Sequence, residues 1–544
     1  MDEAPANDDT TAGAVAADGT IDPDVARLVR GVLWPGFLGR TAPAWLLREL
    51  DGGLAGVVYF GQNIGTDPAE TAALSATLRA HQPSILIGVD EEGGNVSRLE
   101  ALTGSTLPGH AQLGALDDVE VTKAVGVEIA RRLREAGTNI ALAPVADVNT
   151  NPLNPVIGNR AFGSTGALVA RHTAALVEGL QSAGVAACVK HYPGHGDTAT
   201  DSHLSLPRIE LPLDEIDREH QPPFQAAIDA GTASIMTAHI VVPALRALRQ
   251  AQGPDVDVAG DALRQAQGPE GPVTELVDVP ATLNPTILGR LRATGFDGVI
   301  ISDALDMAAI RSTVGSGNGA VLALRAGVDL LCIGNPSNLG PKLGATTDED
   351  DYLEVFEAVC AAVADGSLDR GIVERAAARV QRLVVELADV PLPAARSFAE
   401  EIAQVVQVAG DVVIDAAALT ILDLRNRPTF AVASAADPFV DALSERYTVT
   451  RVPVGESIAD GDDEALDAAL DALDETHGVI VVTDQQSIAG AQSAAAERIA
   501  ARRPDAVLVG VGLRATLPTA LASIDTLAAS RLSADRVRDL VSAQ

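Results

Sequence analysis

The chain has 544 residues, of which 47% are hydrophobic and 21% charged, and it carries a formal net charge of −35. This length predicts two or three globular domains with large apolar cores. The strong negative charge argues against nucleic acids and anionic membranes as partners, because both are bound through basic surfaces. No apolar run is long enough to cross a bilayer, and we therefore expect a soluble protein.

The chain begins with an acidic, alanine-rich stretch that we read as a disordered tail over residues 1–24. This stretch has neither a basic start nor an apolar segment, so it is unlike a secretory signal. The cysteines Cys188, Cys332 and Cys360 show no metal-binding or redox spacing, and two of them lie in apolar, strand-like runs. We expect buried free thiols in a reducing compartment, which makes the cytoplasm the expected location.

Between residues 25 and 388, short apolar runs alternate with longer amphipathic stretches. Seven runs read as strands, at 56–60, 85–89, 140–144, 186–189, 234–237, 298–301 and 329–333. Helices are expected at 115–135, 168–183 and 213–230. Continuous apolar strands alternating with helices predict a parallel sheet covered by helices, and seven or eight such units fit a (β/α)8 barrel of the TIM type. A barrel would bring the polar residues that follow these strands to one rim.

Three features follow the main part of the predicted barrel or interrupt it. Residues 247–254 recur unchanged at 262–269, which indicates a duplicated loop insertion over 247–272. A proline-containing linker is expected at 389–399. Beyond it, a smaller α/β sandwich is expected over 400–544, with strands at 419–422, 429–432, 448–452, 479–482 and 506–511 and helices at 463–473 and 488–501. This part has no dense polar cluster, and we expect a structural or substrate-flanking role for it.

The segment Lys190–His203 reads K-H-Y-P-G-H-G-D-T-A-T-D-S-H and holds three of the chain's nine histidines. It follows the apolar run 185–189, so we expect a loop at a strand end, where α/β proteins place catalytic groups. A polar structural loop is one interpretation. A metal site is another, with His191, His195, Asp197 and His203 as candidate ligands, although their spacing matches no regular zinc pattern. We favour proton transfer, because Asp201 can orient the His203 imidazole as a general acid/base.

Other polar residues at strand ends are ambiguous by themselves. Asp303 ends the run at 298–303 and fits a nucleophile, a metal ligand or the N-cap of a helix over 304–311. The sequence D-E-E-G-G at 90–94 also follows a predicted strand and is equally compatible with a charged turn. The short motif at 158–160 is weaker still.

Taken in order, five motifs resemble the bacterial β-N-acetylglucosaminidases of glycoside hydrolase family 3. They are I-G-V-D-E-E-G-G-N-V-S-R (87–98), A-P-V-A-D-V-N-T-N-P (143–152), N-P-V-I-G-N-R-A-F-G (154–163), K-H-Y-P-G-H-G-D-T-A-T-D-S-H (190–203) and S-D-A-L-D-M (302–307). The resemblance covers about residues 25–390, and a smaller α/β domain after the barrel also occurs in that family.

The resemblance implies roles for individual residues. Asp303 would be the nucleophile that forms a covalent glycosyl-enzyme, and His203, paired with Asp201 on a mobile loop, would be the acid/base. The hydroxyls of the terminal N-acetylglucosamine would be held by Asp90, Arg98, Arg160, Lys190 and His191. No metal and no organic cofactor is implied. The chain departs from the family pattern at Asn159, where an aspartate is usual, and at Glu91, where a glutamine is frequent.

The expected function is that of a retaining exo-β-N-acetylglucosaminidase acting on peptidoglycan fragments; by family resemblance, the implied substrate is an N-acetylglucosaminyl-1,6-anhydro-muropeptide or a related wall fragment. The partner is therefore a small carbohydrate, and the sequence leaves the oligomeric state open. Alternatives within the family are a β-glucosidase and an N-acetylglucosaminide phosphorylase; the latter is suggested because a neutral imidazole would not repel phosphate. Alternatives from other classes are a non-catalytic sugar-binding protein and a metal-dependent hydrolase.

Overall fold

The computed structural model describes residues 21–199, 206–245, 279–337, 348–386, 390–425, 436–484, 490–513 and 520–542. Four of the sequence predictions lie outside these residues: Asp201, His203, the duplicated insertion at 247–272 and the strand at 429–432.

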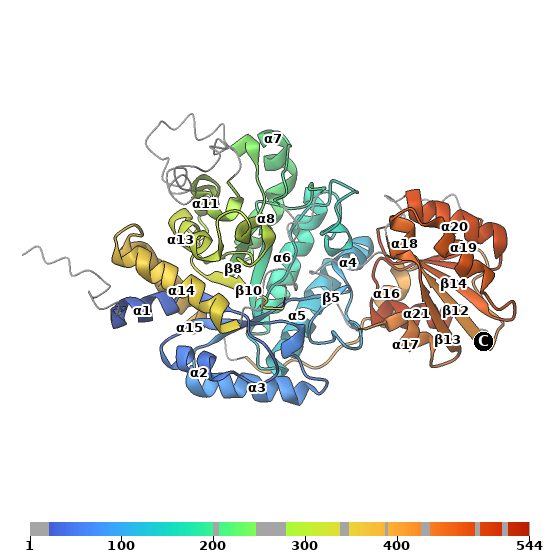
Figure 1. Cartoon of the computed structure of the whole chain (residues 1–544), viewed down its shortest axis with the longest axis horizontal. Coiled ribbons are helices and arrows are strands. Elements are labelled where there is room, and N and C mark those ends of the chain that lie inside the picture. The colour runs from blue at the N-terminus through green and yellow to red at the C-terminus, as the bar shows by residue number, and fades with distance from the viewer. Residues whose placement is uncertain are drawn as a thin grey trace, which may run out of the picture.

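Eight parallel strands form the first part of the molecule. Their bounds are β1 Leu33–Pro35, β2 Gly56–Tyr59, β3 Leu86–Val89, β6 Ile140–Ala141, β7 Ala186–Tyr192, β8 Ser234–Thr237, β9 Val299–Ile301 and β10 Leu331–Gly334. Six of them make a curled sheet in the order β2-β3-β6-β7-β8-β9, and β1 pairs with β10. A parallel bridge between Ile301 and Leu330 connects β9 to the chain entering β10, and β1 lies beside β2. This order confirms the predicted TIM-type architecture (Figure 1).

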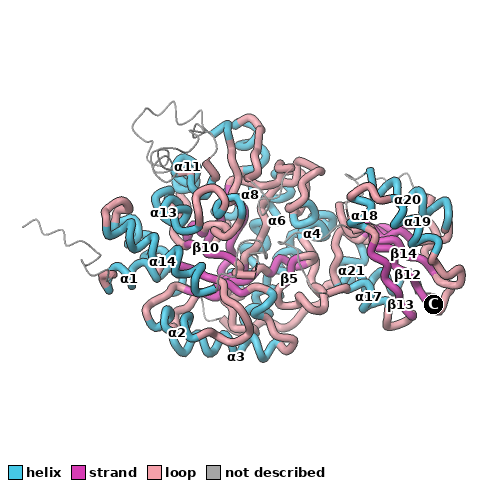
Figure 2. The backbone as a smooth tube through the Cα atoms, viewed as in Figure 1, coloured by secondary structure: helices cyan, strands magenta, loops and turns pink. Residues whose placement is uncertain are grey.

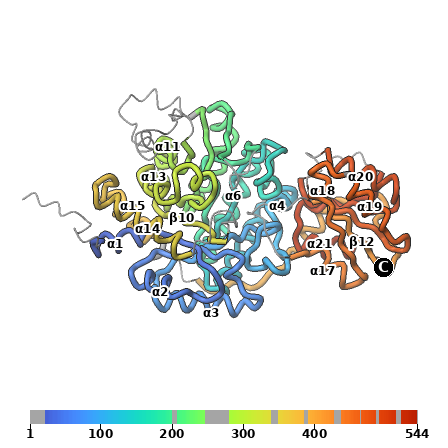
Figure 3. The backbone as a smooth tube through the Cα atoms, viewed as in Figure 1, coloured from blue at the N-terminus to red at the C-terminus, as the bar shows by residue number. Residues whose placement is uncertain are grey.

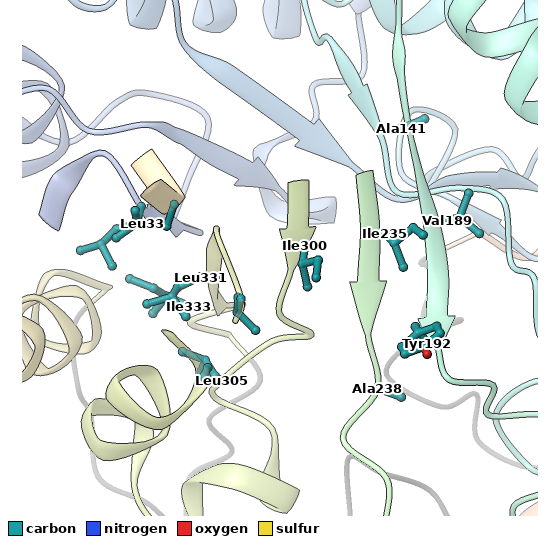
Figure 4. Close-up of a cluster of buried hydrophobic side chains, with 14 of the residues drawn as sticks. Leu33, Ala141, Val189, Tyr192, Ile235, Ala238, Ile300, Leu305, Leu331 and Ile333 are labelled. Atoms are coloured by element: carbon teal, nitrogen blue, oxygen red, sulfur yellow. The ribbon is translucent and has the colours of Figure 1, made fainter. Parts of the chain in front are cut away.

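The strands are mainly apolar because both of their faces are buried. Within β8, Ile235 belongs to the large cluster that the strands share with the surrounding helices, whereas Met236 belongs to the cluster inside the barrel. The same alternation separates Ile300 from Ile301 in β9. Figure 4 shows part of the larger cluster, with side chains from β1, β7, β8, β9 and β10. A period-2 pattern of two apolar faces therefore builds both layers of the core.

The helices of the barrel cover the outside of the sheet (Figure 2). They are α1 Pro23–Arg30, α2 Ala44–Asp51, α3 Pro68–His81, α4 His110–Leu116, α5 Val119–Glu135, α6 Gly166–Ser182, α7 Leu213–Glu215, α8 Pro222–Asp229, α11 Pro285–Ala293, α12 Ala308–Arg311, α13 Ser316–Ala326, α14 Asp348–Ala364 and α15 Arg370–Glu386.

Some helix bounds differ from the predicted ones for local reasons. The stretch 115–135 is interrupted at Asp117, which adopts the left-handed conformation, and Asp118 then caps α5. The stretch 213–230 contains a π-helical turn, Ile216–His220, between α7 and α8. Helix α1 starts within the region expected as tail, because the Asp22 carboxylate accepts hydrogen bonds from two N–H groups of its first turn.

A second sheet follows an extended segment over residues 390–398. Its strands are β11 Gln407–Ala409, β12 Ala418–Asp423, β13 Thr448–Pro453, β14 Gly478–Thr483, β15 Val507–Gly510 and β16 Ala522–Asp525, in the order β11-β16-β15-β14-β12-β13 with only β11 antiparallel. The helices here are α16 Ala399–Val405, α17 Pro438–Leu443, α18 Gly455–Ala459, α19 Asp463–Asp471, α20 Gly490–Arg502 and α21 Arg531–Val541. Two separate apolar clusters cover the two faces of the sheet, so this part is an α/β sandwich.

The sandwich lies beside the part of the barrel that contains α4 (Figures 1 and 3) and the short strand β5, Val96–Ser97 (Figure 1). The three cysteines are buried free thiols, as the sequence predicted. Among the described residues, no helix combines the length and apolar character that a bilayer crossing requires.

Candidate active site

A cavity of about 330 Å³ opens at the C-terminal ends of the barrel strands. All five predicted sugar-binding residues and Asp303 line it, together with Gln62, His195, Met236, Met307, Cys332 and Asn335. A larger cavity of about 410 Å³ is lined by residues at the opposite, N-terminal ends of β7, β8 and β9. We assign the candidate site to the smaller cavity, because the convergent charged groups and the strand ends that carry chemistry in this fold are found there.

Asp90 follows β3 directly and lies between two cations. Its Oδ1 accepts a hydrogen bond of 2.7 Å from Lys190 Nζ, and its Oδ2 lies 3.5 Å from Arg98 Nη2. Burial alone would raise the pKa of Asp90, but Lys190 and Arg98 lower this pKa below its ordinary value. Asp90 is therefore a carboxylate that can accept hydrogen bonds from sugar hydroxyls.

Glu92 is a central residue of the site that the sequence analysis did not single out. Its carboxylate is fully buried in the short hairpin of β4 (Glu91–Gly93) and β5 (Val96–Ser97). Arg160 binds it in a bidentate manner, with distances of 3.0 Å from Nε and 2.7 Å from Nη2, and Lys190 Nζ lies 2.7 Å away. Burial opposes ionisation, yet the two cations hold the pKa of Glu92 well below its ordinary value. Glu92 thus fixes the positions of two predicted sugar-binding cations.

Lys190 and His191 lie within β7 and not in the loop after it, because β7 continues to Tyr192. The expectation that the loop begins at Lys190 is therefore wrong by three residues. A strand is more rigid than a loop, and it holds the Lys190 ammonium in contact with Asp90 and Glu92.

Asp147 orients the His191 ring through a contact with its Nδ1 atom. Its Oδ2 lies 2.7 Å from His191 Nδ1, and its Oδ1 accepts the His195 N–H at 2.6 Å. Burial would raise the pKa of Asp147, but His191 and the other hydrogen bonds lower it. Since the carboxylate is ionised and accepts the hydrogen bond, Nδ1 of His191 carries a proton toward it, and this bond fixes the orientation of the ring. Asp147 lies in the motif at 143–152, but nothing in the sequence pairs it with His191.

His195 is also buried, and it lies on the segment that leads toward the predicted acid/base residues. Burial lowers its pKa to about 4, so the ring is neutral. Its carbonyl accepts a hydrogen bond of 2.8 Å from Asn154 Nδ2, and Asp197 accepts one of 2.9 Å from Thr150. The chain leading toward Asp201 and His203, themselves outside the described residues, is thereby held at the rim of the cavity.

Asp303 lies two residues beyond β9, and it is partly exposed to the cavity. Its Oδ1 accepts a hydrogen bond of 2.8 Å from the N–H of Ala304, and its own N–H lies 3.4 Å from Thr237 Oγ1. The interpretation of Asp303 as a helix N-cap is wrong, because the next helix, α12, begins only at Ala308 and Met307 holds the cap position. Within the described part of the chain, no three histidine, cysteine or acidic residues are grouped to hold a metal ion.

Comparison with known proteins agrees with this geometry. Residues 40–383 match the model of the glycosyl hydrolase family 3 N terminal domain. "Beta-hexosaminidase" from Xylella fastidiosa (strain 9a5c) is 34% identical over 319 residues, which are 57% of this chain and 85% of that protein. "Beta-hexosaminidase A" from Pseudoalteromonas piscicida is 32% identical over 51% of this chain, but the match spans only 45% of that longer protein.

A solved structure extends the similarity to both parts of the molecule. The glycoside hydrolase family 3 β-N-acetylglucosaminidase from Paenibacillus sp. str. FPU-7 has a TM-score of 0.74 and 28% sequence identity, and the match covers 95% of this chain and 97% of that one. With a family match over more than half of its length, the chain belongs to glycoside hydrolase family 3.

Proposed function

We propose that this protein is a retaining exo-β-N-acetylglucosaminidase, with Asp303 as its nucleophile. The observation that carries the proposal is that Asp303 shares one small cavity with the cluster of Asp90, Lys190 and Arg160. A cavity of about 330 Å³ is at the lower end of the range for ligand sites, which suits a single terminal sugar better than an internal chain segment. The names of the related proteins support a substrate of the N-acetylhexosamine class.

The proposed reaction has two steps. In the first, the Asp303 carboxylate attacks C1 of the sugar while His203 donates a proton to the departing glycosidic oxygen, so that a covalent glycosyl-aspartate and a free alcohol are formed. In the second, His203 takes a proton from water, which attacks C1 and releases Asp303 and the sugar with its β configuration retained. Asp201 would orient the imidazole in both steps. Asp90, Lys190 and His191 would hold the hydroxyls.

The natural substrates that we propose are peptidoglycan fragments with a terminal β-linked N-acetylglucosamine. Support comes from the five motifs described above and from an exo-type cavity. Incubation with purified muropeptides should release free N-acetylglucosamine, and chromatography of the products would show it.

Trapping of the covalent intermediate tests the nucleophile. A slow fluorinated N-acetylglucosaminide should add one sugar to the protein, and peptide mass spectrometry should place the label on Asp303. A label on another residue would remove Asp303 from this role. In parallel, comparing an aryl N-acetylglucosaminide with the matching aryl glucoside separates the proposed activity from that of a β-glucosidase, and no turnover of either would favour a binding protein.

The acid/base role of His203 is tested through the leaving group. His203→Ala should reduce cleavage of a poor alkyl leaving group far more than cleavage of an activated aryl one, which hardly needs a proton. Equal losses on both substrates would exclude His203 as the acid.

A further inference from the structure

Two asparagines of the barrel bind the backbone of the sandwich next to the candidate site. Asn159 Nδ2 donates to the carbonyl oxygens of Val511 and Leu527, at 3.1 and 3.2 Å. Val511 directly follows β15, and Leu527 lies two residues beyond β16. Asn159 therefore binds the chain just beyond the C-terminal ends of β15 and β16. This side of the second sheet lies beside the barrel (Figure 1).

Asn95 completes this contact from the hairpin between β4 and β5. Its Oδ1 accepts the N–H of Ala529 at 2.6 Å, and its Nδ2 donates to Asn159 Oδ1 at 3.3 Å. Each amide thus uses its oxygen as an acceptor and its nitrogen as a donor. Reversing the Asn159 amide would place its oxygen against two carbonyls, so the hydrogen-bond pattern assigns a single orientation.

Both asparagines belong to the segments that carry the buried Arg160–Glu92 ion pair. Asn159 immediately precedes Arg160 in a 3-10 turn, and Asn95 lies three residues after Glu92 in the same hairpin. The two segments are far apart in sequence, and the ion pair holds them together inside the barrel. The Asn95–Asn159 pair and the sandwich backbone hold the same two segments together on the side that faces the sandwich.

We propose that the sandwich is a positioning element of the sugar-binding site, acting through Asn159 and Asn95 on the Arg160–Glu92 pair. Glu92 in turn shares Lys190 with Asp90, so a shift of the hairpin moves the groups that would hold the sugar hydroxyls. Neither asparagine lines the cavity, and their effect is therefore indirect. The kinetic test of this proposal rests on the glycosidase activity proposed above. The structural coupling between the sandwich and the Arg160–Glu92 pair does not depend on that activity.

This role also explains why residue 159 is an asparagine in this chain. An aspartate at the same place would lose both donors and would bring a negative charge within about 3 Å of two carbonyl oxygens. The amide is the side chain of this size that satisfies two carbonyls and one N–H donor together.

The test compares Asn159→Asp with a matched change elsewhere in the same interface. Gln112 in α4 donates through Nε2 to Thr526 O at 2.8 Å and to Ser533 Oγ at 3.1 Å, but it does not line the cavity or adjoin the ion pair in sequence. Gln112→Glu therefore also removes donors to the sandwich. Asn95→Asp is a milder third variant, because it keeps the bond from Ala529 and loses only the donor to Asn159.

On an aryl N-acetylglucosaminide, Asn159→Asp should raise KM at least tenfold while kcat changes less than about threefold, because ground-state hydroxyl contacts are displaced and the nucleophile is not. Gln112→Glu should lower the melting temperature and leave KM within about twofold. An unchanged KM in Asn159→Asp, or an equal rise in Gln112→Glu, would overturn the proposal.

Hydrogen exchange supplies a readout that needs no activity. Peptides covering residues 91–98 and 156–161 should exchange faster in Asn159→Asp than in the wild type or in Gln112→Glu. Unchanged exchange in both peptides would refute the coupling. If the wild type cleaves no aryl substrate but exchange increases as expected, the proposed function fails and the coupling stands.

Discussion

Glu91 should make the stability of this protein fall as the pH rises, and replacing it with glutamine should remove that dependence. The Glu91 side chain is fully buried in the β4–β5 hairpin. Its Oε2 accepts the N–H groups of Arg98 and Leu99, at 3.0 and 3.1 Å, whereas its Oε1 has no hydrogen-bond partner among the described residues. Burial raises the pKa of Glu91 from 4.5 to about 7, because its effect outweighs that of the hydrogen bonds, which lower this pKa.

The magnitude follows from this pKa difference. Each pKa unit corresponds to about 1.4 kcal/mol, so the difference of about 2.5 between 4.5 and 7 is worth about 3–4 kcal/mol. The sign follows from proton binding. Between pH 4.5 and 7 the folded protein keeps a proton on Glu91 that the unfolded chain has lost, and stability therefore decreases as the pH rises through this window. Above pH 7 the full penalty is present, because the buried carboxylate is then ionised.

Glutamine at position 91 has the same shape and never ionises. We therefore expect the melting temperature of Glu91→Gln, relative to the wild type, to increase progressively between pH 4.5 and 8 and to reach a gain of several degrees. Thermal unfolding of both proteins in a series of buffers measures this difference. An exposed glutamate of α14 provides the control Glu357→Gln, which should show no such trend. A difference between Glu91→Gln and wild type that stays constant with pH would refute the reasoning.

Three further outcomes are expected. Asp303→Asn should lower kcat on an aryl N-acetylglucosaminide by roughly three orders of magnitude or more without lowering the melting temperature; activity within tenfold of the wild type would contradict a nucleophile at this position. Lys190→Met leaves two carboxylates without the ammonium that they share, and the loss of a buried ion pair should cost about 3–5 kcal/mol, seen as a lower melting temperature together with a higher KM. Asp147→Asn should raise KM roughly tenfold, since the His191 ring loses the acceptor that sets its tautomer; a KM equal to that of the wild type would refute this orienting role.

Much of the barrel could be predicted from the chain, because its strands are short apolar runs separated by amphipathic helices. Strand β1 was missed, since it has only three residues and ends in a proline. In the sandwich, β11 and β16 were missed for a similar reason: β11 is exposed along its whole length, and β16 is only partly buried, so neither shows an apolar run. Helix bounds failed where a single residue such as Asp117 interrupts the helix.

The candidate site could be predicted in part, because parallel strands bring their ends to one rim. That rule groups Asp90, Lys190 and Asp303 without any knowledge of their contacts. Contacts between segments that are distant in sequence could not be predicted in this way. The bond from Ala529 to Asn95 joins residues 434 positions apart, and no local pattern in a single sequence indicates it.

The three consecutive acids Asp90, Glu91 and Glu92 show how one short stretch can contain opposite electrostatic behaviour. Their side chains alternate in direction along an extended backbone. Asp90 and Glu92 both reach Lys190, and the pKa of each lies below its ordinary value. Glu91 points to the other side, where it meets backbone N–H groups and no ion-pair partner among the described residues, and its pKa rises to about 7. Burial opposes the ionisation of all three carboxylates, so the position of the cations decides which of them stay ionised. A glutamine suits the middle position of this stretch and neither of its neighbours, because, among the described residues, only the middle carboxylate forms no ion pair with a cation.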